Sequence, residues 1–215
     1  MANAEQVLFR SWSDFDEWRH IIEGEHIVFG KVSYFDDPEH PCQEGYANGK
    51  IYSFNRRHTD YIGDDKEEMI EDLISNHHAV QLSYHEHGNC TWFVRGTQQP
   101  PDMRWDGSYF AGLWVPEQDA LDNIGDPNAE DFQTRLLEYA KGVCEHYTAW
   151  CNGNIYEYEV KLFKILRDED GEIVTDEDFY DTFYAKPLQE ERGGEYIDTV
   201  ECQREAESVA KGMLK

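Results

Sequence analysis

The sequence predicts an α+β fold in which a mixed or mainly antiparallel sheet packs on one long central helix. Apolar side chains recur every three or four positions over residues 128–151, which is typical of a helix with one buried face. Other short segments alternate apolar and polar residues, as half-buried strands do, and turn sequences at residues 88–89 and 168–171 predict hairpins. With 215 residues and 40% hydrophobic content the chain can bury one sizeable core. We therefore expect one domain over residues 1–190 and a helical appendage over residues 191–215.

The first part of the chain predicts one helix followed by two strands. Ser13 and the acids after it predict the start of a helix, because acids complement the positive end of the helix dipole. Gly24 should end this helix. Residues 26–35 and 50–55 have strand character, and a loop rich in proline, glycine and aspartate separates them.

The middle of the chain predicts an acidic helix over residues 64–76 and then a β-hairpin. Alternation over residues 80–84 and a returning strand over 91–95 form the hairpin, with Gly88-Asn89 as its two-residue turn. A long loop leads to a strand over residues 109–115. Pro116 then opens a short helix over residues 117–123, since proline is tolerated in a first turn.

The last part of the chain predicts the long helix, a strand and a second helix. Asn152-Gly153 should end the long helix, because glycine readily adopts the left-handed conformation found there. A strand over residues 156–166 leads into an acidic turn at residues 168–171. Residues 196–213 predict an exposed, charged helix whose apolar contacts are Ile197, Val200, Val209 and Met213.

The charge of the chain restricts the class of partner. There are 45 Asp and Glu against 19 Lys and Arg, giving a formal net charge of −26 and a pI near 4.5. Such a protein repels nucleic acid and anionic membranes and attracts basic protein surfaces. No segment is apolar enough to span a membrane, and the first residues lack the pattern of a secretory signal, so we expect a soluble, cytoplasmic protein. Five irregularly spaced cysteines favour reduced thiols over a disulfide framework.

Four short motifs follow one another between residues 45 and 160. They are Phe54-Asn55-Arg56-Arg57-His58 with Gly63-Asp64, Leu82-Ser83-Tyr84 with His87-Gly88, Arg104-Trp105-Asp106-Gly107 with Ala111-Gly112-Leu113-Trp114-Val115, and Tyr147 and Trp150 with Gly153-Asn154-Ile155-Tyr156. Their order resembles a family of uncharacterised proteins found in tailed phages and other mobile elements, although this chain has Asn55 where that family tends to have His. The resemblance implies a viral or mobile-element origin and brings no assigned activity or catalytic residues.

Two clusters could carry chemistry. Arg56 and Arg57, with His58, could clamp a phosphate or carboxylate, although internal pairing with the many carboxylates is the favoured interpretation. A two-residue turn would place His87 opposite Cys90 and His85 on the same face, where imidazole and thiolate could hold zinc. The alternative is that these side chains lie in solvent and bind no metal. We expect no metal or other cofactor, since no paired ligand spacing supports the site.

The leading functional hypothesis is an acidic accessory protein that binds and inhibits a host nucleic-acid-handling or defence protein. Its carboxylates would mimic the phosphates of DNA, at spacings of about 6–7 Å, and occupy a basic groove. One alternative is a small metal-dependent or phosphate-handling enzyme, and another is an acidic protein of a high-salt host whose charge only keeps the fold hydrated. The candidate partner-binding residues are Asp64, Asp65, Glu67, Glu68, Glu71, Asp72, Asp168, Glu169, Asp170, Asp176, Glu177, Asp178 and Asp181.

Overall fold

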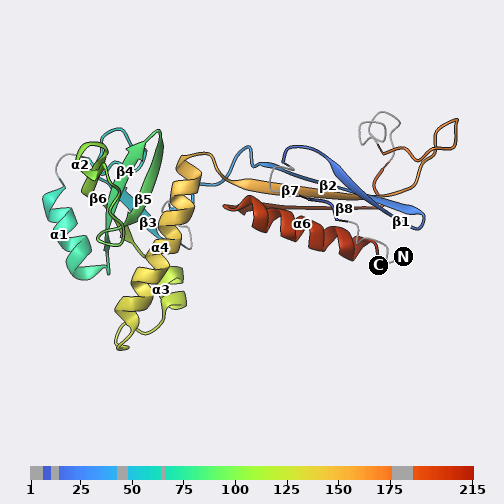
Figure 1. Ribbon diagram of the computed structural model, residues 1–215. Coiled ribbons are helices and arrows are strands. Elements are labelled where there is room, and N and C mark those ends of the chain that lie inside the picture. Colours follow the sequence, from blue (N-terminus) through green and yellow to red (C-terminus); the bar gives the residue numbers. More distant parts are fainter. Residues whose placement is uncertain (1–6, 11–14, 43–47, 64–65, 176–185) are drawn as a thin grey trace. The chain divides into compact units, whose positions relative to one another are not determined.

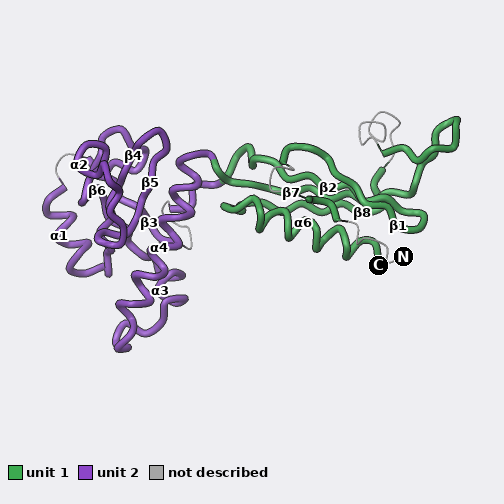
Figure 2. The backbone as a smooth tube through the Cα atoms, viewed as in Figure 1, with its two compact units in different colours: residues 1–38, 154–215 green, residues 39–153 purple. Residues whose placement is uncertain are grey.

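The computed structural model describes residues 7–10, 15–42, 48–63, 66–175 and 186–215. Contacts within the chain divide it into two compact units, residues 1–38 with 154–215 (unit 1) and residues 39–153 (unit 2), which Figure 2 shows in different colours. Each unit contains a four-stranded antiparallel sheet with helices packed on it. The predicted α+β class is therefore confirmed. Among the described residues, no helix is both long and apolar enough to cross a membrane.

Unit 1 is a sheet with one helix on one face (Figure 1). The strands are β1 (Arg19–Glu23), β2 (His26–Tyr34), β7 (Tyr156–Lys164) and β8 (Gln189–Tyr196), in that spatial order. The central strands β2 and β7 pair along their whole length, from His26 opposite Lys164 to Tyr34 opposite Tyr156. Unit 2 is therefore inserted between two strands that are neighbours in the sheet of unit 1.

The helix of unit 1, α6 (Thr199–Met213), packs through small residues. Cys202, Ala206 and Ala210 are fully buried at helical spacing, and they meet the inward side chains of β2 and β7, Val28, Val32, Val160 and Leu162 among them. Of the apolar contacts that the sequence predicted for this helix, Val209 and Met213 pack against the same cluster, whereas Ile197 and Val200 are exposed. Residues 191–215, expected as an appendage, contribute most of β8 and all of α6 to unit 1.

Unit 2 is a sheet with helices on both faces. Its strands are β3 (Lys50–Ser53), β4 (Val80–His87), β5 (Asn89–Val94) and β6 (Gly107–Val115), in the spatial order β3-β6-β4-β5. One face carries α4 (Phe132–Cys151), and α1 (Glu67–Asn76) lies on the other through Ile70 and Leu73. The short helices α2 (Met103–Asp106) and α3 (Gln118–Ile124) flank β6.

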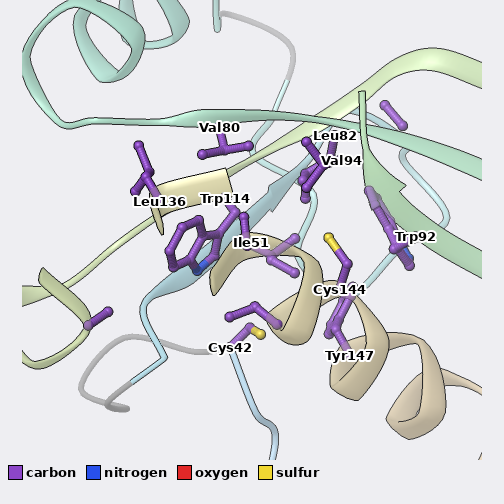
Figure 3. Close-up of a cluster of buried hydrophobic side chains, with 14 of the residues drawn as sticks. Cys42, Ile51, Val80, Leu82, Trp92, Val94, Trp114, Leu136, Cys144 and Tyr147 are labelled. Carbon is purple, nitrogen blue, oxygen red and sulfur yellow. The ribbon is translucent and has the colours of Figure 1, made fainter. Parts of the chain in front are cut away.

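The predicted apolar stripe of α4 forms the centre of unit 2. Its buried residues are Phe132, Leu136, Ala140, Val143, Cys144 and Tyr147, and Figure 3 shows several of them against the side chains of the sheet. The helix begins at Phe132, four residues later than predicted, and ends at Cys151 as predicted. Trp114, which is fully buried, stacks on Tyr139 of the same helix at 5.8 Å between ring centroids. The periodicity of α4 thus correctly identified the face that the sheet covers.

The prediction of a helix that ends at Gly24 is wrong, because the segment before Gly24 forms strand β1. Ser13 and Asp14, its expected cap, lie outside the described residues. Ile21 packs towards α6, whereas Ile22 packs in the cluster on the opposite face of the sheet, which is the alternation of a strand. Gly24, at φ +60°, makes the tight turn that returns the chain into β2. Pairing with β2 therefore overrides the local helical signal.

We predict that Phe132→Ala lowers the free energy of unfolding by about 3–5 kcal/mol, because the ring is buried between α4 and the sheet. Gln133→Ala, at the exposed neighbouring position, should change the free energy of unfolding by less than about 0.5 kcal/mol. Urea denaturation of both variants measures the difference. Equal, small changes in the two variants would show that this face of α4 is not buried.

Candidate functional site

Helix α1 presents a row of carboxylates to solvent. Glu67, Glu68, Glu71 and Asp72 are all exposed, and they define the α1 acidic face. Asp72 accepts a hydrogen bond from the side chain of Asn76 at 2.8 Å, and the other three have no ion pair with any described residue. The neighbouring acids Asp64 and Asp65, predicted to belong to the same surface, lie outside the described residues.

The charges of the α1 acidic face act on the helix in two opposite ways. Glu67 and Glu68 lie in the first turn, where acids complement the positive end of the helix dipole. Glu67 with Glu71, and Glu68 with Asp72, are like-charge pairs four positions apart, which destabilise a helix by roughly 0.2–0.5 kcal/mol each. The last turn contains no Lys or Arg. The nearest cation along the chain, Lys66, donates to the carbonyl of Phe54 at 3.3 Å and lies over that ring. The dipole and the like-charge pairs are of similar strength, so local folding energetics leave only Glu71, which lies outside the first turn and has no cationic partner among the described residues, without a stabilising role in the helix.

The second predicted acidic surface is a turn in unit 1. Asp168, Glu169 and Asp170 are exposed, but the Asp168 carboxylate accepts hydrogen bonds from the amides of Asp170 at 3.0 Å and Glu172 at 2.9 Å. Asp168 therefore holds the turn, as Asp commonly does. The remaining predicted residues, Asp176, Glu177, Asp178 and Asp181, lie outside the described residues. The α1 acidic face belongs to unit 2, so the two surfaces are separate candidates.

The predicted hairpin register is wrong by one residue. Gly88 alone, at φ +84°, connects β4 to β5, so that His87 lies opposite Asn89 and Glu86 lies opposite Cys90. Side chains alternate between the two faces of a strand, so a register shift of one residue pairs each residue with a different partner and changes which residues share a face. Cys90 therefore shares a face with Glu86, towards α4, whereas His85 and His87 lie on the opposite face.

This register separates the three predicted zinc ligands. The Nδ1 atom of His87 lies 3.0 Å from a carboxylate oxygen of Asp106, and this hydrogen bond raises the pKa of His87. The Nε2 atom of His85 is buried without a hydrogen-bond partner. Within the part of the chain that the structure describes, no three His, Cys, Asp or Glu side chains are grouped as metal ligands would be.

The arginine pair lies in the turn after β3. Arg56 and Arg57 are exposed, and the amide of Arg57 donates to the side chain of Asn55 at 3.0 Å. No ion pair joins Arg57 to a described residue, so the internal pairing that the sequence favours is not seen within this part of the chain. Arg57 and His58 instead line a cavity of about 310 Å³, which is entirely within unit 2.

No pattern in the sequence indicates this cavity. Its lining combines the aromatic side chains of Tyr84, Trp92, Tyr147 and Trp150 with polar residues, and it includes two cysteines, Cys90 from β5 and Cys151 from the end of α4. The aromatic rings of Trp92 and Tyr147 lie 5.6 Å apart, and Trp150 stacks on Tyr147 at 6.1 Å. The lining is more polar than apolar, so a ligand of this cavity would have to contact polar groups as well as aromatic rings.

The hydrogen bonds of His58 exclude it as a base for Ser53. The side-chain amide of Asn55 donates to Nε2 of His58 at 3.2 Å, which leaves the ring proton on Nδ1. Nδ1 then donates to the hydroxyl oxygen of Ser53 at 2.7 Å, and burial lowers the pKa of His58, so the ring is neutral. Ser53 is also fully buried. A serine nucleophile at this position has neither an acceptor for its proton nor access to a substrate.

A second polar cluster, formed by His40, Asp60 and Tyr147, links three segments of unit 2 through hydrogen bonds. The amide of Cys42 donates to Nδ1 of His40 at 3.1 Å, so Nε2 carries the proton and donates to Asp60 at 3.1 Å. The hydroxyl of Tyr147 donates to the same carboxylate oxygen. Burial raises the pKa of Asp60, but the hydrogen bonds from His40 and Tyr147 outweigh it and the pKa falls below its ordinary value. Because both ring nitrogens of His40 are occupied, this cluster is structural.

Another exposed group lies in α2. The side chain of Trp105 is 77% exposed, and the guanidinium of Arg104 lies 5.1 Å from its ring centroid. No other large hydrophobic residue in the described part of the chain is as exposed. Trp and Arg are enriched at the centres of protein–protein interfaces.

Comparison with protein-family models, with curated proteins and with solved structures gave no match. The resemblance to the tailed-phage family thus stays a prediction from the four short motifs.

We predict that Asp60→Asn lowers the free energy of unfolding by about 1–3 kcal/mol at neutral pH, because it removes a charged acceptor that is only 12% exposed. The native pKa of Asp60 lies below its ordinary value of 3.8, so its stabilisation is present above that value and is lost as the pH falls through the native pKa. The difference between wild type and variant should therefore shrink below about pH 4. Urea denaturation at several pH values measures it, and a difference that does not depend on pH would contradict the assignment.

Proposed function

We propose that this protein binds and inhibits a host nucleic-acid-handling or defence protein through the α1 acidic face. One observation supports this function above the others: Glu67, Glu68 and Glu71 are exposed and have no cationic partner among the described residues. The helix dipole accounts in part for Glu67 and Glu68, whereas Glu71 lies outside the first turn and forms a like-charge pair with Glu67 that opposes helix formation, so a use outside folding explains Glu71 better than a structural one. A basic groove on another protein would neutralise them.

Mimicry of DNA is the mechanism that this spacing favours. Four residues of α-helix rise by about 6 Å, so the paired carboxylates form a row with a spacing comparable to that of backbone phosphates. A partner that binds DNA with Lys and Arg would bind such a row through the same side chains and with the same dependence on salt. The net charge of −26 would add long-range attraction to a basic partner.

Two further features support a protein partner in a host cell. The exposed Trp105, with Arg104 against it, offers an aromatic anchor of the kind found at protein interfaces. The resemblance to proteins of tailed phages and mobile elements fits a protein that acts on host factors. Under this proposal the protein acts in the host cytoplasm and needs no cofactor.

The alternatives are less well supported. A metal-dependent enzyme built on His85, His87 and Cys90 loses its basis, because the hairpin register puts Cys90 on the other face. A phosphate-handling enzyme would retain only Arg56 and Arg57, which are exposed. The high-salt alternative stays open, and it predicts that folding requires molar salt, which circular dichroism at low salt would reveal.

We predict that the quadruple variant Glu67→Lys, Glu68→Lys, Glu71→Lys, Asp72→Lys loses its host partner. The experiment is affinity capture from host lysate on immobilised wild-type and variant protein, with bound proteins identified by mass spectrometry. A partner held by charge should elute between about 50 mM and 200 mM salt and should be displaced by duplex DNA.

The matched control reverses four exposed acids elsewhere, Glu130, Glu145, Glu191 and Glu205, and so changes the net charge equally. The control should retain most of the captured partner. Equal loss in both variants would show that only net charge matters, and full retention by the α1 variant would exclude this face. A partner that duplex DNA does not displace would exclude mimicry while leaving protein binding intact.

A further inference from the structure

Cys90 and Cys151 form a pair of neighbouring thiols at one cavity. Both line the cavity of about 310 Å³ in unit 2, and the thiol of Cys151 hydrogen-bonds to that of Cys90. Cys151 is exposed and Cys90 is partly exposed, whereas the other three cysteines, Cys42, Cys144 and Cys202, are buried. The two accessible thiols of this chain are therefore the two that lie together.

Backbone hydrogen bonds hold this pair in place. The side chain of Asn152, next to Cys151, accepts from the amide of Cys90 at 3.0 Å and donates to its carbonyl at 2.9 Å. One turn earlier in α4, the hydroxyl of Thr148 accepts from the amide of Trp92 at 2.9 Å. These hydrogen bonds from Thr148 and Asn152 fix the end of α4 to β5. They therefore restrict the distance between the thiols of Cys90 and Cys151 without a covalent bond.

The surroundings distinguish the two thiols from each other and from the buried ones. The hydrogen bond from Cys151 lowers the pKa of Cys90, although burial and the charge of Glu86 across the hairpin oppose this. The same bond and burial raise the pKa of Cys151. Burial raises the pKa of Cys144 and of Cys202 to about 12. Cys90 is therefore the thiol best suited to act as a nucleophile.

We propose that Cys90 and Cys151 are a thiol–disulfide exchange site for low-molecular-weight disulfides that enter this cavity. The thiolate of Cys90 attacks one sulfur of the small disulfide, whose S–S bond breaks and releases one thiolate, which takes up a proton. Cys151 then loses its proton and attacks the sulfur of Cys90, releasing the second small thiol. The two cysteines are oxidised to one disulfide, and the small disulfide is reduced to two thiols.

The cavity and the position in the fold support this exchange. The aromatic side chains in its lining can contact the apolar part of a small disulfide beside Cys90, which lies at the start of an edge strand. The new bond would join β5 to the end of α4, across 61 residues of chain, and so would covalently duplicate the link that Asn152 already makes. This proposal does not depend on the proposed binding function, because the α1 acidic face takes no part in it.

The test treats the reduced, folded wild-type protein with hydroxyethyl disulfide, an uncharged probe that the net negative charge does not repel. After alkylation of remaining thiols, peptide mass spectrometry should find one disulfide, between Cys90 and Cys151. Oxidation should raise the melting temperature by roughly 5–10 °C, because it closes a long loop in the unfolded chain. Absence of this disulfide, or a melting temperature that is unchanged or lower, would overturn the proposal.

Single variants test the order of the two steps. Cys151→Ser should accumulate the mixed disulfide on Cys90, whereas Cys90→Ser should form its adduct on Cys151 at least about tenfold more slowly. Cys144→Ala, which alters a buried thiol, should react as wild type does. Equal rates in the two single variants would overturn the assignment of Cys90 as nucleophile. Should a serine variant fail to fold, Cys90→Ala and Cys151→Ala replace it, and the disulfide found by mass spectrometry in the wild-type protein still decides the outcome.

Discussion

The contact between the last turn of α4 and strand β5 is the interaction on which unit 2 depends. Strand β5 is at the edge of its sheet, so half of its backbone groups have no neighbouring strand. The side chain of Thr148 accepts a hydrogen bond from the backbone amide of Trp92, and the side chain of Asn152 bonds to the backbone amide and carbonyl of Cys90. These side chains take the place of a neighbouring strand. A helix thereby covers an edge that would otherwise be open to pairing with another chain.

This contact also determines what the cavity can do. Because the end of α4 is fixed to β5, the hydroxyl of Tyr147 is placed where it donates a hydrogen bond to Asp60. Cys151 is brought beside Cys90 by the same turn. The polar groups near the cavity are mostly engaged in hydrogen bonds that hold the fold, His40 and His58 included. The thiols are the groups whose chemistry the fold leaves available.

The parts of the fold that the sequence predicted are those specified by local pattern. The stripe of α4 and the acids of α1 can be read from neighbouring residues, and the structure contains both. Strand β1 and the register at Gly88 were mispredicted because pairing with another strand decides them. The thiol pair could not be predicted, since Cys90 and Cys151 are brought together only by the packing of α4 on β5; the local sequence marked Cys90 only as a candidate zinc ligand beside His85 and His87.

Amide hydrogen exchange at Cys90 and Trp92, measured by NMR in wild type and in Asn152→Ala, tests this contact most directly. If the side chain of Asn152 replaces a strand at this edge, its loss should speed exchange at Cys90 by about tenfold, corresponding to about one hydrogen bond. Trp92, held by Thr148, should change less, and Gln133→Ala on the exposed side of α4 should leave both amides unchanged. Unaltered exchange at Cys90 in Asn152→Ala would contradict the claim that α4 holds the edge of β5.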